Sequence, residues 1–204
     1  AAEATYGHIS TWETSAVTDT SALFEDASSF NDDIGAWDVS GVTTMVDMFL
    51  GASSFNRDIG EWRVESVTDM RYMFEDAFAF NRSIGNWDVS NVKDMYGMFD
   101  WAFAFNQPIG AWDVSGVTRL EEMFQGARSF NQSLNDWDIS NVGDMSWMFE
   151  AAVSFNQPLN AWNLASVTMM DGMFKNATSF NQPLSAWSFP SVTSMHSMFR
   201  LAKS

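Results

Sequence analysis

Residues 87–107, WDVSNVKDMYGMFDWAFAFNQ, contain the pattern that determines the fold of this chain. Trp87, the first residue of this stretch, and Phe99 both recur every 25 residues without a gap. The tryptophans are Trp12, Trp37, Trp62, Trp87, Trp112, Trp137, Trp162 and Trp187. A fixed period of this length is typical of repeat proteins, in which each unit covers its apolar face with its neighbours. The sequence therefore predicts one domain over residues 1–204, with coil 1 at about 6–30 and an unfinished coil 8 at about 181–204.

The apolar spacing within a coil predicts two short elements. Apolar residues from Ile84 to Val92 fall at i, i+3, i+5 and i+8, which matches the core of leucine-rich repeats. Trp87 and Val89 alternate with Asp88, which indicates a very short strand. After Val92 the spacing becomes helical. We therefore expect an α/β repeat, a right-handed leucine-rich-repeat-like solenoid with a short parallel strand and a short α- or 3₁₀-helix per coil. A purely extended second leg is the alternative.

Two other periodic columns are expected inside the stack. An asparagine follows the last phenylalanine of each coil, from Asn31 to Asn181, and its amide can satisfy backbone groups of the turn. Most of the 14 methionines also keep the period, as in Met95 and Met98. Periodic apolar columns are typical of a core, so we interpret these methionines as packing residues.

The quoted stretch resembles the BspA-like repeat of bacterial and algal surface proteins, a type found in mycoplasma lipoproteins and related to leucine-rich repeats. The resemblance covers essentially the whole chain. Coil 1 departs from the pattern, with Thr14 in the valine column and Thr20 and Leu23 in the methionine columns, which suits a terminal coil partly facing water. The resemblance implies an extracellular or surface-exposed module for adhesion or protein contact. It brings no catalytic residues.

Charge and composition narrow the classes of partner. The chain has 26 acidic and 10 basic residues, a formal net charge of −16, and no acidic residue follows Asp171. Such a field repels phosphate backbones, so no nucleic-acid partner is expected. No apolar run approaches the roughly 18 residues that would cross a bilayer, so no transmembrane segment is expected. Residues 1–4 do not have the pattern of a signal peptide, and the absence of cysteine excludes disulfides.

Six aromatic side chains break the repeat. They are Tyr72, Phe78, Tyr96, Trp101, Phe103 and Trp147, at positions that are small or polar in most other coils. On a helical wheel these positions lie outside the apolar stripe or at its flank, and Phe78 and Phe103, one coil apart, should stack. Exposed aromatic clusters are typical of interaction surfaces. We therefore interpret the six as candidate partner-binding residues, with incidental packing at the flank of the core as the alternative.

Three acids form a file on the outward side of the predicted strand. They are Asp88, Asp113 and Asp138, in successive coils. Coils in such stacks lie about 4.8 Å apart, so these charges repel unless water, a cation such as Ca²⁺ or a basic partner screens them. A calcium site needs about six to eight oxygens around one point, which a straight file does not supply. Solvated acids are therefore the favoured interpretation, with calcium as the alternative, and no cofactor is expected.

No arrangement in the sequence supports catalysis. The two histidines, His8 and His196, fall at opposite ends of the predicted stack. There is no Ser-His-Asp arrangement, phosphate-binding loop or histidine-rich metal motif. The consecutive Glu121 and Glu122 would not face each other on a helix. The sequence therefore predicts a protein that is not an enzyme.

The hypothesis that follows is a binding or adhesion module that recognises a protein or a glycan. It would be secreted or exposed at a cell surface. The alternative is a structural accessory subunit held in a larger assembly, at a membrane or in an organelle lumen. The stretch after Asp171 has no acid and carries Lys175, Arg200 and Lys203. The C-terminal coil is therefore a candidate docking end for an acidic partner or a second copy.

Overall fold

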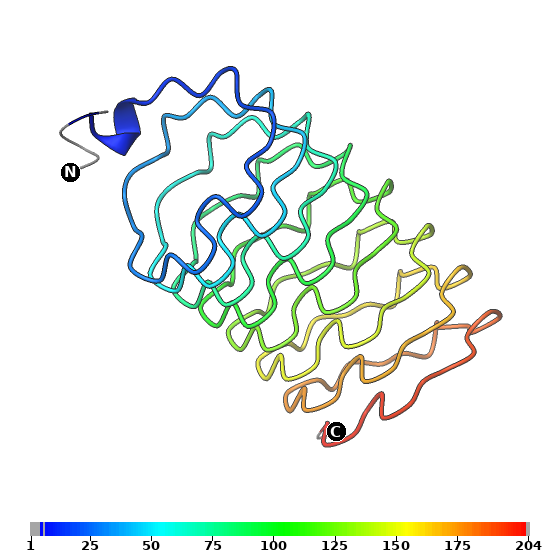
Figure 1. Ribbon diagram of the computed structural model, residues 1–204. Coiled ribbons are helices and arrows are strands. Elements are labelled where there is room, and N and C mark those ends of the chain that lie inside the picture. The colour runs from blue at the N-terminus through cyan, green and yellow to red at the C-terminus, as the bar shows by residue number, and fades with distance from the viewer. Residues whose placement is uncertain (1–4, 6, 203–204) are drawn as a thin grey trace.

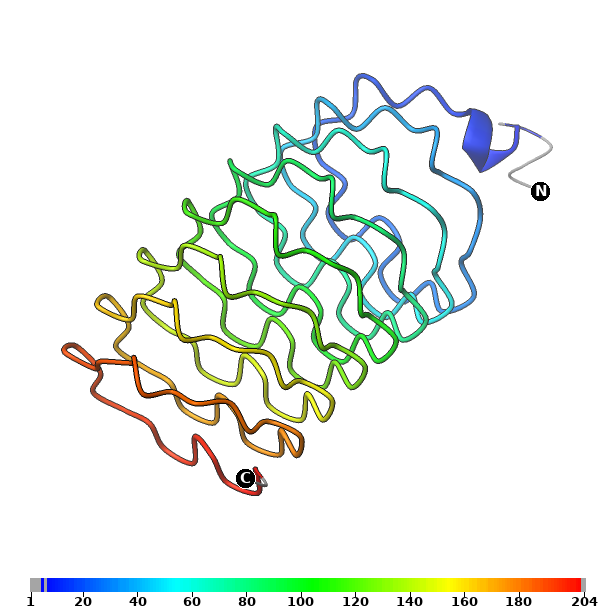
Figure 2. The same cartoon turned by 180° about the vertical axis from the view of Figure 1, so that it is seen from behind.

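A computed structural model describes residue 5 and residues 7–202 of the chain. Figures 1 and 2 show the chain winding through successive coils of similar outline, each lying on the one before, with the two termini at opposite ends of the stack. We number the coils so that coil 4 is residues 81–105. The only helix within residues 7–202 is η1, the 3₁₀ turn Ile9–Thr11 near the start of coil 1.

Neighbouring coils are joined by parallel pairing that is one residue wide. Asp19 pairs with Thr44, Thr44 pairs with Asp69, and the series continues to the pair Met169 and Ser194. These are isolated bridges, and residues 7–202 contain no longer strand. Every pair joins positions that are one period apart, which confirms the predicted 25-residue repeat.

The prediction of an α/β repeat, right-handed and leucine-rich-repeat-like with a strand and a helix per coil, is wrong. In the leg from Val92 to Ala102, the bridge residue Asp94 is followed by a run of turns over residues 96–101, and no helix forms. Two residues of this leg have a positive φ, in this coil Gly97 at 60° and Trp101 at 53°. A left-handed residue every fourth position prevents a right-handed helix from continuing.

The predicted strand around Trp87 fails because turns close on both sides of it. The N–H of Trp87 donates to the carbonyl of Ile84 at 3.1 Å, and the N–H of Val92 donates to the carbonyl of Val89 at 2.9 Å. Only a very short extended segment remains between these turns. Its backbone makes no ladder with the next coil within the described residues.

The backbone N–H groups of the turn-rich leg alternate between two kinds of acceptor. In coil 3, the N–H groups of alternate residues from Met70 to Asp76 donate to carbonyls of the next coil at 2.9–3.0 Å. Between them, the N–H groups of Met73 and Glu75 donate to the carbonyl three residues back in the same coil. An α-helix would direct every N–H to the fourth residue back and leave the coils unjoined. The alternation therefore turns the chain and fastens it to the next coil at once.

Aromatic side chains fill the core in files that follow the stack. Phe74 stacks on Phe80 of its own coil with ring centroids 4.0 Å apart, and lies 5.6 Å from Phe99 of the next coil. The tryptophans form a second file, in which Trp87 and Trp112 are 6.5 Å apart. Offset stacking of this kind adds to the stabilisation from burial. One hydrophobic cluster extends through the whole stack.

The methionine columns belong to this core, as predicted. Met70, Met73, Met95 and Met98 have no exposed surface. Met195 in the last coil is the exception in its column, because no described coil follows it, and it is 47 % exposed. These methionines fill the space between the aromatic files.

Polar groups join the coils at fixed points. The indole Nε1–H of Trp87 donates to the carbonyl of Ile59 in the coil before, and the other tryptophans from Trp37 to Trp187 repeat this contact. The amide oxygen of Asn81 accepts from the backbone N–H of Asn106 at 3.0 Å. This confirms the predicted asparagine ladder, although its members are partly rather than fully buried.

Candidate binding face

The six aromatic residues that break the repeat all lie in the turn-rich leg. We call this side of the stack the turn flank, defined as residues 92–103 and the equivalent positions of the other coils. Tyr72 and Tyr96 have ring centroids 4.7 Å apart, and Phe78 stacks on Phe103 at 4.7 Å, as their spacing predicts. Trp101 meets Phe103 edge-on at 5.8 Å. The structure therefore gathers five of the six into two contacting groups in coils 3 and 4, and leaves the sixth in coil 6.

The helical wheel gave the wrong reason for their exposure. Tyr72, Trp101 and Trp147 leave the core because they occupy the left-handed positions of the leg, with φ of 54°, 53° and 56°. In each case the same position of the next coil is a glycine. The glycines are Gly97 after Tyr72, Gly126 after Trp101 and Gly172 after Trp147. A Cβ built on any of them would lie 2.5–2.7 Å from an atom of the aromatic ring. Each ring therefore covers a glycine with one face.

Gly126→Ala should lower the free energy of unfolding by about 1–2 kcal/mol or more. Alanine is strained at φ +64°, a left-handed conformation, and the added methyl group would contact the ring of Trp101 at 2.7 Å. In a Trp101→Ala background only the backbone strain should remain. Urea melts of the four proteins give the coupling free energy. Gly143→Ala is the matched control, because nothing lies within 4 Å of its Cβ position. A strictly additive cycle would contradict the ring-on-glycine contact.

A short apolar and cationic strip lies beside these rings. Phe78, Phe103 and Arg128 occupy the same position of three successive coils. The guanidinium carbon of Arg128 lies 4.3 Å from the centre of the Phe103 ring, within the range of a cation–π contact. Phe78 is 40 % exposed, at the open end of the strip. Its outer face is therefore accessible apolar surface.

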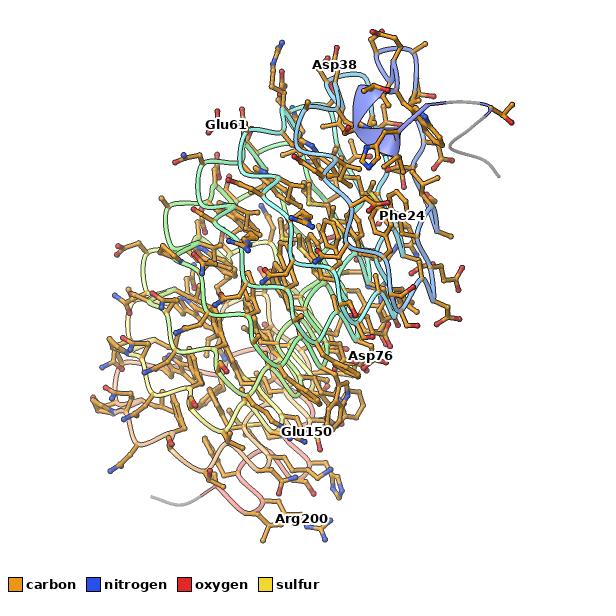
Figure 3. All side chains as sticks on the ribbon, turned by 90° about the vertical axis from the view of Figure 1, so that its left-hand side faces the viewer. Phe24, Asp38, Glu61, Asp76, Glu150 and Arg200 are labelled. Atoms are coloured by element: carbon orange, nitrogen blue, oxygen red, sulfur yellow. The ribbon has the colours of Figure 1, made fainter. Side chains whose placement is uncertain are left out.

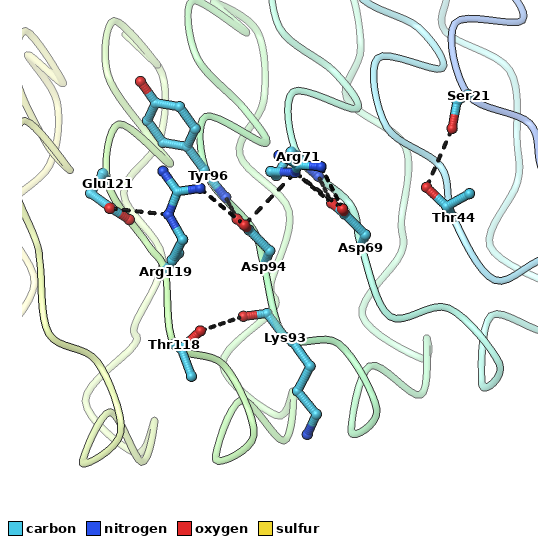
Figure 4. A network of polar contacts seen from close by, with 10 residues as sticks. All are labelled: Ser21, Thr44, Asp69, Arg71, Lys93, Asp94, Tyr96, Thr118, Arg119 and Glu121. Carbon is cyan, nitrogen blue, oxygen red and sulfur yellow. Dashed lines mark hydrogen bonds and ion pairs between the residues drawn. The ribbon is translucent and has the colours of Figure 1, made fainter.

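A chain of ion pairs runs along the bridge positions (Figure 4). The guanidinium of Arg71 binds both carboxylate oxygens of Asp69 and lies 3.7 Å from Asp94. Arg119 donates to Asp94 at 3.1 Å and to Glu121 at 3.2 Å. The Arg119 guanidinium carbon also lies 4.6 Å from the centre of the Tyr96 ring. The two arginines thus neutralise three acids of this flank and order the aromatic residue beside them.

Two other acids of the turn flank have no such partner. Glu75 and Asp100 occupy the same position in coils 3 and 4, and neither belongs to an ion pair within the described part of the chain. Asp100 is only 6 % exposed, and its Oδ1 is buried without a hydrogen-bond partner. Burial, followed by the proximity of Glu75, Glu122 and Asp76, raises the pKa of Asp100 to about 8. Burial and neighbouring acids raise the pKa of Glu75 to about 7. This pair is the least compensated charge on the flank.

The acidic file lies away from the turn flank. Figure 3 shows Asp38, which shares the position of the file, and Glu61 apart from Asp76 and Glu150. Each acid of the file accepts hydrogen bonds within its own turn, as Asp88 does from the N–H and hydroxyl of Ser90. These bonds, the hydroxyl first, hold the pKa of Asp88 below its ordinary value. Asp113 and Asp138 make the same turn. Each of these acids is therefore stabilised by its own coil.

No catalytic constellation forms in the described residues. His8 lies in the first coil and His196 in the last, at opposite ends of the stack as the sequence predicted. Glu121 pairs with Arg119, whereas Glu122 lies at a left-handed position, φ 59°. No group of three or more His, Cys, Asp or Glu within residue 5 and residues 7–202 could hold a metal ion.

The two end coils expose apolar side chains. Leu23 in coil 1 and Phe199 in coil 8 are each 48 % exposed. Of the basic residues predicted for docking, Lys175 is paired with Glu150 at 2.6 Å and is therefore committed within the stack. Lys203 lies outside the described residues.

Sequence reasoning missed the acids and arginines of the turn flank. Glu75, Asp100, Arg119 and Arg128 were not among the candidate residues. Their signal was available in the period, because positions 25 residues apart become neighbours, and Glu75 and Asp100 are 25 apart. Opposite or like charges at this spacing therefore indicate contacts between coils.

Comparison with known proteins gives a family without an assigned activity. The family described as Mycoplasma protein of unknown function, DUF285, matches residues 1–110 and 97–204, which together cover the chain. No curated protein and no solved structure matches it. Among the described residues there is no helix long and apolar enough to span a membrane.

Proposed function

The chain belongs to the DUF285 repeat family of Mycoplasma proteins, and from that premise we propose that it is a non-enzymatic binding module, secreted or exposed at the cell surface. The stack is a rigid scaffold, and its turn flank is the binding face for a protein or glycan. The finer resemblance to BspA-like adhesion repeats supports this proposal. Nucleic acid is disfavoured as a partner because the net charge is −16.

The observation that carries the proposal is the cluster of aromatic side chains in coils 3 and 4. Phe78 and Phe103 stack outside the core file, and Trp101 packs edge-on against Phe103. The same positions hold serine in coils 1 and 2, so the repeat folds without phenylalanine there. Aromatic side chains beside an arginine are typical of binding hot spots.

The test is retention of a partner by the immobilised chain. The Phe78→Ser/Phe103→Ser variant should retain at least about tenfold less of any protein, or of any glycan on an array, than the native chain retains, since hot-spot losses exceed about 1.4 kcal/mol. Asp88→Ser/Asp113→Ser is the control on the other flank and should retain the same molecules. Equal retention of the same molecules by all three proteins would exclude the aromatic cluster as the binding face.

A second candidate is a structural accessory subunit of a larger assembly. The exposed apolar side chains Leu23 and Phe199 are surface that a larger assembly would cover. Sedimentation of native material separates the two candidates. A binding module sediments alone, whereas a permanent subunit sediments only with its assembly.

A further inference from the structure

We propose that the turn flank binds a lysine or arginine side chain of a basic protein segment between Glu75 and Asp100. This inference rests on the proposed function and names the class of partner for the same face. In another coil, the acid at this position is paired with a base. In coil 6 the equivalent acid is Glu150, and the same position of the next coil holds Lys175, whose ammonium lies 2.6 Å from the Glu150 carboxylate.

Coils 3 and 4 have the same backbone pairing at this place but no basic side chain. Glu75 and Asp100 are successive members of the column that holds Glu150 and Lys175, but both are acids. The backbone fixes their spacing, because the N–H of Asp76 donates to the carbonyl of Asp100 at 2.9 Å. Burying a carboxylate without a partner is costly, yet Asp100 is 6 % exposed with an unpartnered Oδ1. The structure therefore presents the acceptors of a charge-assisted hydrogen bond without the donor.

Two arginines of this flank pair with other acids. Arg71 and Arg119 bind Asp69, Asp94 and Glu121. The nearest basic position along the column is occupied by Lys175, which is paired three coils away from Asp100. No described base forms an ion pair with Glu75 or Asp100, so a donor from another molecule can take this place.

An ammonium or guanidinium group fits this place better than a metal ion. A calcium ion needs about six to eight oxygens around one point, and the described residues supply no group of three acids that converge on a metal. A single ammonium needs only two or three acceptors.

The surrounding charge selects a basic segment rather than a second copy of this chain. The electrostatic neighbours of Asp100 and Glu75 are all acidic, namely Asp47, Asp76 and Glu122. A second copy would bring a net charge of −16 to this field. A basic segment would be attracted to it and would associate faster at low salt.

The experiment measures binding of acetylated hexalysine amide to the full chain by calorimetry at low and physiological salt. At pH 8.5, where both carboxyls are mostly ionised, Glu75→Gln/Asp100→Asn should weaken binding at least about tenfold, because it removes both acceptor charges. Asp88→Asn/Asp113→Asn changes the net charge by the same amount on the other flank and should change the affinity less than about threefold. An equal loss in both variants, or no loss in either, would overturn the proposal.

Gln125→Lys gives an independent test. Gln125 follows Asp100 by one coil in the same column, as Lys175 follows Glu150. The new lysine should pair with Asp100, raise the melting temperature and displace hexalysine. A variant that is more stable and still binds hexalysine with native affinity would overturn the proposal. Glu75→Gln/Asp100→Asn could leave hexalysine binding unchanged while Phe78→Ser/Phe103→Ser still loses its partner. In that case the inference of a basic partner is wrong and the proposed function stands.

Discussion

Trp112→Ala should lower the free energy of unfolding by about 3–5 kcal/mol, the range for a large aromatic in a packed core. Trp112 is 4 % exposed, stacks 6.5 Å from Trp87, and donates its Nε1–H to the carbonyl of Ile84. Truncation would therefore leave a cavity between two coils and remove one of the two hydrogen bonds that the Ile84 carbonyl accepts. Urea melts of the variant and the native chain measure the difference.

Two tryptophans serve as controls for this prediction. Trp12 in the first coil is 43 % exposed and Trp147 on the turn flank is 39 % exposed, so each alanine variant should lose much less stability. The contrast separates burial in the shared core from the size of the residue. Equal and small losses at all three positions would contradict a continuous core.

Lowering the pH from about 8.5 to about 5.5 should stabilise the protein. The pKa of Asp100 is raised to about 8 and that of Glu75 to about 7, by burial first and then by neighbouring acids. In this window the folded chain binds more protons at these groups than the unfolded chain, so the free energy of unfolding falls as the pH rises. The melting temperature should therefore be several degrees higher at the acidic end.

Asp100→Asn should remove much of this pH dependence and should stabilise the protein at pH 8.5. The amide replaces a buried carboxylate that loses its proton as the pH passes about 8. Asp88→Asn is the control, because hydrogen bonds from Ser90 lower the pKa of Asp88, so it stays ionised throughout this window. An unchanged slope in Asp100→Asn, or the same change in both variants, would contradict the assignment of the slope to Asp100.

The core could be predicted from the sequence because it depends on the period alone. The columns of Trp87, Phe99 and Met95 are buried wherever a described coil covers them. The asparagine ladder followed from the same spacing, with Asn81 and Asn106 in contact. Period and polarity suffice for these positions, because a column that is apolar in every coil can only face the interior.

The local conformation could not be predicted because the decisive backbone angles carry little sequence signal. The two left-handed columns contain twelve non-glycine residues and only four glycines, Gly51, Gly97, Gly126 and Gly172. Left-handed φ is usually signalled by glycine, and here the contacts between coils impose it on residues such as Tyr72 and Trp101. The spacing of Val92, Met95, Met98 and Phe99 then fits a helix and a series of turns equally well.

The candidate site was predicted in part. The six aromatic residues were identified because they interrupt columns, which requires only an alignment of the coils. The position of Glu75 beside Asp100 and the ion pair of Glu150 with Lys175 could not be read from positions within one coil. These contacts form between coils, and their effect depends on how deeply each charge is buried, which the sequence does not show.

Because the backbone hydrogen bonds between coils repeat every 25 residues, the stack can change length only by whole coils. The carbonyl that accepts from Tyr72 lies 24 residues later, at Tyr96, and coils 1 to 7 all keep this offset. Loss of a whole 25-residue unit brings each donor to an equivalent acceptor, and the Phe, Trp and Asn files close again. Loss of one residue displaces every subsequent side chain from its file. It also moves residues that now have a negative φ into the positions where the fold requires a positive φ. Deletion of 75 bases from the gene should therefore preserve the fold, whereas a shorter in-frame deletion inside a coil should disrupt it.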